Sequence, residues 1–127
     1  MCLQGASAFD HILGNLAGKQ VRTFVVWEPV LFTDWSSPST ATLARISVTR
    51  AAQFWDKGRV ISQSIGEHDR GSIVWDYIAV YPVGAVWDQN PPQPLYSGGP
   101  LIQVIDETRT ALAHALKGDQ VPQAGSK

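Results

Sequence analysis

The segment Ile73–Tyr81, with the sequence IVWDYIAVY, constrains the fold of this chain more than any other. It is long, β-branched and aromatic, and this composition favours a strand that is buried on both faces. Such a strand needs a sheet with helices on both sides. The turn Pro82–Ala85 and the short apolar segment Ala85–Asp88 follow it, so we predict a β-hairpin over residues 73–88.

Hydrophobic periodicity and turn residues predict the other elements. A helix is expected over residues 7–17, where Phe9, Ile12, Leu13 and Leu16 share one face. In chain order there follow a strand over Gln20–Val26, a helix from Pro38 to Ile46 capped by Ser37, a strand over Arg50–Trp55 and a short helix over Val60–Gly66. After the loop QNPPQPLYSGGP comes a final helix, whose apolar face carries Ile102, Ile105, Leu112 and Leu116.

The order of these elements predicts an α/β fold with a mixed four-stranded sheet flanked by helices. A β-α-β unit makes parallel strands, and a hairpin adds antiparallel neighbours. We assign residues 1–117 to a single domain and residues 118–127 to a disordered tail. A chain of 127 residues buries about two-thirds of its surface on folding, which is enough for a core without disulfides.

Charge and composition exclude several classes of partner. Ten basic and eleven acidic residues are spread along the chain without a basic block, so no nucleic-acid partner is expected. No apolar run approaches the roughly 20 residues of a membrane span, and the first residues lack the pattern of a signal peptide. We therefore expect a cytoplasmic protein. The one cysteine, Cys2, excludes an intramolecular disulfide and a cysteine-rich zinc site.

A short loop motif and the element order together resemble a known family. The motif is Trp35-Ser36-Ser37-Pro38-Ser39, which enters the first helix of the β-α-β unit. Thioredoxins have Trp-Cys-Gly-Pro-Cys at that place, so the chain resembles the thioredoxin-like fold family with Ser36 and Ser39 at the two cysteine positions. The segments Val25–Trp35, Gln53–Arg59 and Ile73–Trp87 are also similar to an uncharacterised bacterial family of thioredoxin-like proteins.

The two serines remove the chemistry that this resemblance would otherwise imply. Thiol–disulfide exchange needs a thiolate that attacks sulfur, and a serine hydroxyl is not ionised at neutral pH. The family also carries a cis-proline before the long hairpin strand, whereas this chain reads Gly71-Ser72-Ile73 there. Two-cysteine redox chemistry is therefore excluded by the residues themselves, and no cofactor is expected.

The predicted working surface is the loop Glu28–Ser39 between the first strand and the second helix, together with the turn around His68–Ser72 before the hairpin. Its candidate ligand-binding residues are Glu28, Asp34, Trp35, Ser36, Ser39 and His68. Trp35 is expected to be exposed, in contrast to most of the other tryptophans, because the resemblance implies that its loop lies at the surface. Exposed tryptophans often anchor partners. The cluster Glu67-His68-Asp69 holds metal-ligand types, but it lacks the spacing of a zinc site, so no metal is expected.

Three hypotheses for the function follow. The leading one is a redox-inactive, thioredoxin-like binding or interaction module for an unknown protein or small-molecule ligand. The second is a small enzyme with acid–base or serine chemistry near Trp35, carried by Asp34, Ser36 and His68. The third is a structural subunit of a homo-oligomer, such as a homodimer, that associates through a sheet edge or the loop Pro91–Pro100.

Overall fold

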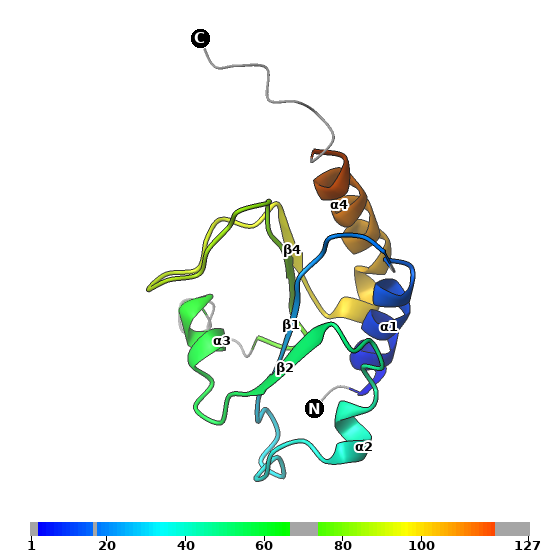
Figure 1. Cartoon of the computed structure of the whole chain (residues 1–127). Coiled ribbons are helices and arrows are strands. Elements are labelled where there is room, and N and C mark those ends of the chain that lie inside the picture. Colours follow the sequence, from blue (N-terminus) through cyan, green and yellow to red (C-terminus); the bar gives the residue numbers. More distant parts are fainter. Residues whose placement is uncertain (1–2, 17, 67–73, 119–127) are drawn as a thin grey trace. The chain divides into compact units, whose positions relative to one another are not determined.

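The computed structural model describes residues 3–16, 18–66 and 74–118 (Figure 1). The chain divides into two compact units, Met1–Asp76 and Tyr77–Lys127. The first unit contains α1 (Leu3–Gly14), β1 (Thr23–Trp27), α2 (Thr40–Leu43), β2 (Ala51–Trp55) and α3 (Val60–Ser64). The second contains β3 (Ile78–Val80), β4 (Tyr96–Gly98), a 3-10 turn η1 (Leu101–Gln103) and α4 (Ile105–Gly118).

Strands β1 and β2 form a parallel pair, as the predicted β-α-β unit requires. Phe24 lies opposite Ala52, and Val26 lies opposite Phe54. The ladder continues past the strand ends, because the Asp56 N–H donates to the Trp27 carbonyl at 2.8 Å. The connecting helix α2 is a single turn and is therefore shorter than the predicted helix from Pro38 to Ile46.

The inner face of this strand pair carries the core of the first unit. Burial alternates along β1, so Val25 and Trp27 point inward while Phe24 and Val26 point outward. The buried core residues come from α1, β1 and the segment after α2: Ala6, Leu13, Trp27 and Ile46. Helix α1 starts four residues before the predicted position at Ser7, and its apolar stripe supplies half of this core.

A partly buried glutamine, Gln53, connects β1, β2 and α2. The Trp27 Nε1–H donates to Gln53 Oε1 at 2.9 Å, and Gln53 Nε2 donates to the Leu43 carbonyl at 3.1 Å. Both amide atoms of Gln53 are thus used, so a polar side chain is tolerated on the inner face of the sheet. The guanidinium of Arg50 donates to the carbonyls of Leu16 and Lys19 beyond the end of α1.

In the second unit, the strands β3 and β4 pair antiparallel, with Ala79 opposite Ser97. Helix α4 contacts both strands. Its Asp106 and Glu107 lie in the first turn and Lys117 lies in the last turn, an arrangement that suits the helix dipole. The final helix is therefore confirmed, although Ile102 precedes it in η1 and is half exposed.

The predicted four-stranded sheet, and with it the thioredoxin-like fold, is wrong. The described residues form two separate two-stranded sheets, one parallel and one antiparallel. The expected long strand is reduced to Ile78–Val80, and Val74–Tyr77 are not extended in a ladder. Asp76 has a φ of 50°, in the left-handed region, and a residue in that region interrupts a strand.

The predicted hairpin partner is also wrong. Residues 85–88 form no strand, and β3 pairs instead with Tyr96–Gly98, which the sequence placed in a proline-rich loop. Three prolines, Pro91, Pro92 and Pro94, precede β4 without entering it, so none of them removes a ladder hydrogen bond.

The single domain expected for residues 1–117 stays a prediction. The predicted tail at 118–127 lies outside the described residues except for Gly118, which ends α4. No helix within the described ranges has the length and apolar character needed to cross a bilayer.

Candidate functional site

The segment between β1 and α2, residues 28–39, is here named the Trp35 loop, and it carries five of the six predicted site residues. Its tip is apolar and open to water: Phe32 is 86 % exposed and Trp35 is 76 % exposed. The two rings contact each other at a tilted angle of 59°, with centroids 6.0 Å apart. The predicted exposure of Trp35 is confirmed, and Phe32 is exposed beside it.

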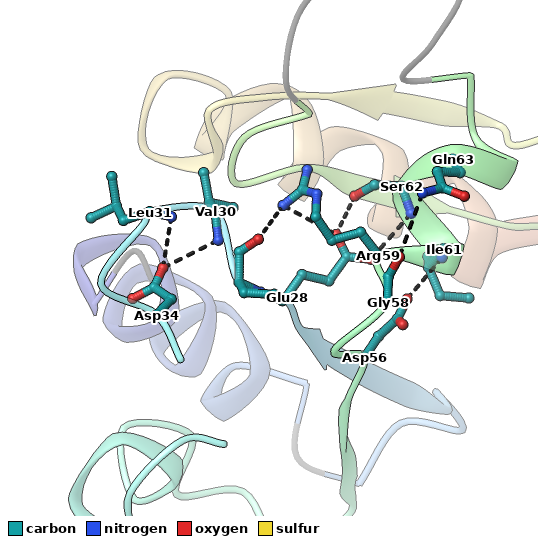
Figure 2. Close-up of polar contacts among 11 residues, drawn as sticks. Glu28, Val30, Leu31, Asp34, Asp56, Gly58, Arg59, Ile61, Ser62 and Gln63 are labelled. Carbon is teal, nitrogen blue, oxygen red and sulfur yellow. Dashed lines mark hydrogen bonds and ion pairs between the residues drawn. The ribbon is translucent and has the colours of Figure 1, made fainter. Parts of the chain in front are cut away.

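Asp34 closes the turn that presents these rings (Figure 2). Its Oδ2 accepts hydrogen bonds from the N–H groups of Val30 at 3.2 Å and Leu31 at 3.0 Å. The Asp34 N–H in turn donates to the Leu31 carbonyl at 2.8 Å. The Leu31 N–H lowers the pKa of the Asp34 carboxyl, because it stabilises the ionised form. Asp34 therefore acts as an ionised brace of the loop.

Glu28 fixes the beginning of the Trp35 loop to the beginning of α3. Its Oε1 accepts the Ser62 N–H at 3.1 Å, and its Oε2 accepts the Ser62 hydroxyl. Arg59 Nη1 lies 4.0 Å from Glu28 Oε2 and donates to the Pro29 carbonyl at 2.8 Å. Figure 2 shows the contacts of Glu28 with Arg59, at the N-cap of α3, and with Ser62 inside this helix.

A second carboxylate lies beside Glu28. Asp56 follows β2 just as Glu28 follows β1, and the parallel register places the two at the same edge of the sheet. Asp56 Oδ2 accepts the Ile61 N–H at 2.9 Å. The two carboxylates thus satisfy the first N–H groups of α3, which Arg59 at the N-cap position cannot do because its side chain has no acceptor.

The environment of Glu28 favours its protonated form. Burial raises the pKa of the Glu28 carboxyl above its usual value, and the hydrogen bond with the Asp56 carboxyl raises it further. The hydrogen bonds from Ser62 and the charge of Arg59 oppose these effects. The oxygens of this carboxyl face Ser62 and Arg59, so its role in this geometry is to position the loop.

The two serines of the motif have different surroundings. The Ser39 hydroxyl accepts the Thr42 N–H at 3.2 Å and lies 3.1 Å from Thr42 Oγ1, so Ser39 is the N-cap of α2. The predicted N-cap, Ser37, is therefore wrong by two residues. Ser36 is exposed on the loop surface. Neither serine is activated by a base among the residues that the structure describes.

His68 and the cluster Glu67-His68-Asp69 lie outside the described residues. The acid–base hypothesis with Asp34, Ser36 and His68 consequently stays a prediction. Within residues 3–16, 18–66 and 74–118, no three His, Cys, Asp or Glu side chains are grouped as metal ligands. The sequence analysis missed Asp56, Arg59 and Ser62. A signal existed for Asp56, since it directly follows the second predicted strand and Glu28 lies two residues after the first.

Comparison with known proteins adds no relative. No protein-family model, curated protein or solved structure matches the chain.

Proposed function

We propose that this protein is a binding module without thiol redox activity and that the Trp35 loop is its contact surface. The observation that carries the proposal is the exposed, mutually packed pair of Phe32 and Trp35 at the tip of a braced loop. The proposed ligand is a protein or a small molecule with an apolar surface, and the proposed location is the cytoplasm.

The physical basis is the free energy of burying the two aromatic side chains. An aromatic side chain buries about 150–250 Å² when it is covered, and interface hot spots are enriched in tryptophan. Leu31, which is 52 % exposed, extends the apolar tip. A partner that covers these three side chains would remove most of the exposed apolar area of the loop.

The hydrogen bonds of Asp34 and Glu28 make the loop suited to binding. A surface that is already ordered loses less conformational entropy on association than a mobile one. Asp34 closes the turn, and Glu28 anchors its start through Ser62. The rings are therefore held in place before any partner arrives.

The charge of the loop narrows the class of partner. Residues 28–39 contain two acidic residues and no lysine or arginine. A nucleic acid or an anionic membrane surface attracts basic side chains, so neither suits this loop. A protein groove or an apolar small molecule suits it better.

Affinity capture with matched variants tests the proposal. The full chain, the double variant Phe32→Ala/Trp35→Ala and the control Phe24→Ala are immobilised and exposed to a bacterial lysate and to a library of apolar small molecules. Bound species are quantified by mass spectrometry. We expect ligands that are retained by the wild type and by Phe24→Ala and are lost from the double variant.

The control isolates the loop because Phe24 is 62 % exposed but lies on β1. An identical set of bound species on the wild type and the double variant would contradict the proposal. Far-UV circular dichroism of the three proteins checks that the variants are folded.

A further inference from the structure

Two carboxyl groups, those of Glu28 and Asp56, lie together at one edge of the β1–β2 sheet. The parallel register pairs the last residues of the two strands, Trp27 and Trp55, and therefore sets the next residue of each strand side by side. The Glu28 side chain is only 11 % exposed, and its carboxyl hydrogen-bonds the carboxyl of Asp56. A hydrogen bond between two carboxyl groups needs one proton, so the pair carries a single negative charge when this bond is made.

The groups around this pair compensate a second negative charge only in part. Arg59 Nη1 lies 4.0 Å from Glu28 Oε2, and its hydrogen bond at 2.8 Å goes to the Pro29 carbonyl. The donors of Ser62 to Glu28 are a backbone N–H and a hydroxyl, which are neutral groups. Lys57, which follows the second carboxyl in the chain, is exposed. Two ionised carboxylates in this place would therefore repel each other in partly buried surroundings.

The same pair connects two segments of the chain. Glu28 is the first residue of the Trp35 loop and accepts hydrogen bonds from Ser62 in α3. Asp34 braces the loop in a different way, through N–H groups that belong to the loop itself. We propose that the Glu28–Asp56 pair is a proton-controlled clamp, which holds the start of the Trp35 loop on α3 while the pair shares a proton and releases it when that proton is lost.

The two braces of the loop titrate in separate ranges of pH. Burial and the neighbouring carboxyl raise the pKa of Glu28 above its usual value of 4.5, whereas the Leu31 N–H lowers the pKa of Asp34 below its usual value of 3.8. As the pH rises from about 4, Glu28 therefore loses its proton while Asp34 stays ionised. Repulsion from Asp56 then favours a Glu28 side chain that turns toward water and leaves Ser62.

This inference rests on the proposed function and adds its regulation. In the protonated state both braces hold the Trp35 loop, and in the ionised state only the Asp34 turn remains. An ordered loop loses less conformational entropy on association than a mobile one. Ligand binding to the loop is therefore expected to weaken as the pH rises.

An NMR titration of the ¹⁵N-labelled full chain from about pH 4 to about pH 8 tests the clamp. The reporters are the amide of Ser62 in α3 and the amides of Val30 and Leu31 in the loop. We expect all three amides to shift with one common midpoint above 4.5. The heteronuclear NOE of the Phe32 and Trp35 amides should fall over the same range, because the released loop gains motion on the picosecond-to-nanosecond timescale.

Three variants of similar size assign the titration to the pair. Glu28→Gln removes the titrating carboxyl and should abolish the common shift of the reporter amides. Asp56→Asn removes the second charge and should move the midpoint down toward 4.5. Glu107→Gln is the matched control, since Glu107 is exposed in the first turn of α4, and it should leave the titration unchanged. If Glu28→Gln fails to fold, the shift of the midpoint in Asp56→Asn decides.

Loop amides that stay unchanged while the Ser62 amide titrates would overturn the clamp, because the loop would then not follow the carboxyl. A midpoint that Asp56→Asn leaves in place, or a common shift that persists in Glu28→Gln, would overturn the role of the pair. A captured ligand that binds equally at about pH 5 and about pH 8 would overturn the regulation of binding. The NMR readouts need no ligand, so their failure is distinguishable from a failure of the affinity capture.

Discussion

Asp76 packs against Gly5 at the start of α1, and this contact within the first unit leaves no room for a side chain on Gly5. Asp76 adopts a φ of 50°, which turns the chain and ends any extension of the strand at that point. A Cβ atom built on Gly5 would overlap the Asp76 carboxylate. Asp76 lies inside the predicted strand Ile73–Tyr81, and the turn at this residue is why the observed strand is limited to Ile78–Val80.

Replacement of Gly5 by alanine should destabilise the protein by about 1–3 kcal/mol, the usual cost of overpacking a filled site. Gly14→Ala is the matched control, because it lies at the other end of α1 with no atom within 4 Å of its built Cβ. That change should be neutral or stabilising by up to about 1 kcal/mol. Urea unfolding monitored by circular dichroism measures the free energies of unfolding of both variants. Equal changes in Gly5→Ala and Gly14→Ala would refute the close contact between Gly5 and Asp76.

Glu28 makes a contribution to the stability of the folded protein that decreases as the pH rises. Its pKa in the folded state lies above the usual value of 4.5, so the folded state holds the proton more tightly than the unfolded state. The stabilisation is complete below the unfolded pKa and is lost as the pH rises through the folded pKa. Each unit of raised pKa corresponds to about 1.4 kcal/mol.

Glu28→Gln keeps an acceptor for Ser62 and removes the titration. At pH 4 the free energy of unfolding of this variant should be close to that of the wild type, and at pH 7 it should be the larger of the two. For Asp34→Asn we expect the opposite pH dependence of the free energy of unfolding. The pKa of Asp34 is lowered, so its stabilisation is fully present above the unfolded pKa and is lost as the pH falls through the folded pKa. Denaturant titrations at pH 4 and pH 7 measure these free energies of unfolding. If the effect of Glu28→Gln is the same at both pH values, the raised pKa of Glu28 is refuted.

At the scale of elements, β1, β2 and α2 form one unit because Gln53 links all three. It accepts from Trp27 Nε1 and donates to the Leu43 carbonyl, and both contacts are partly buried. Removal of one partner from a buried hydrogen bond leaves the other unsatisfied, and this costs more than the bond itself contributes.

Gln53→Leu should therefore destabilise the protein by about 1–3 kcal/mol despite its similar size and greater hydrophobicity. It should also shift the fluorescence of the buried Trp27, whose exposed fraction is 6 %. Gln63→Leu is the control, since Gln63 is exposed and makes only a 3.5 Å contact to the Gly58 carbonyl. If Gln53→Leu is as stable as Gln63→Leu, the two side-chain hydrogen bonds of Gln53 do not stabilise the protein.

At the scale of the whole molecule, the described residues form two separate two-stranded sheets instead of the predicted four-stranded sheet. The predicted lack of dithiol exchange does not depend on that sheet. Cys2 is the only thiol, and a single thiol cannot close an intramolecular disulfide. The prediction that this protein has no dithiol redox activity thus depends on composition and not on the fold.

The expected result in an insulin-reduction assay is no acceleration over dithiothreitol alone. A thioredoxin run at the same concentration serves as the positive control. Turnover that depends on the protein would refute the redox-inactive assignment, and its persistence in Cys2→Ser would point to a contaminant.

The sequence by itself determined the local elements of the first unit. The apolar stripe of α1, the β-branched run of β1 and the strand β2 follow from side-chain periodicity, which depends only on neighbours in the chain. The parallel pairing followed as well, since a helical crossover leaves few alternatives. The exposure of Trp35 was predicted from its place in a loop, and the loss of redox chemistry from residue types.

Only the tertiary structure decided which strands share a sheet and which side chains meet. Strand pairing depends on contacts between distant segments, and a run as apolar as Ile73–Tyr81 does not reveal that Asp76 turns the chain or that Tyr96–Gly98 is the partner of β3. The meeting of Glu28, Asp56 and Ser62 depends likewise on the register of two strands and the position of α3. Each residue type was visible in the sequence, but their proximity is a property of the folded chain.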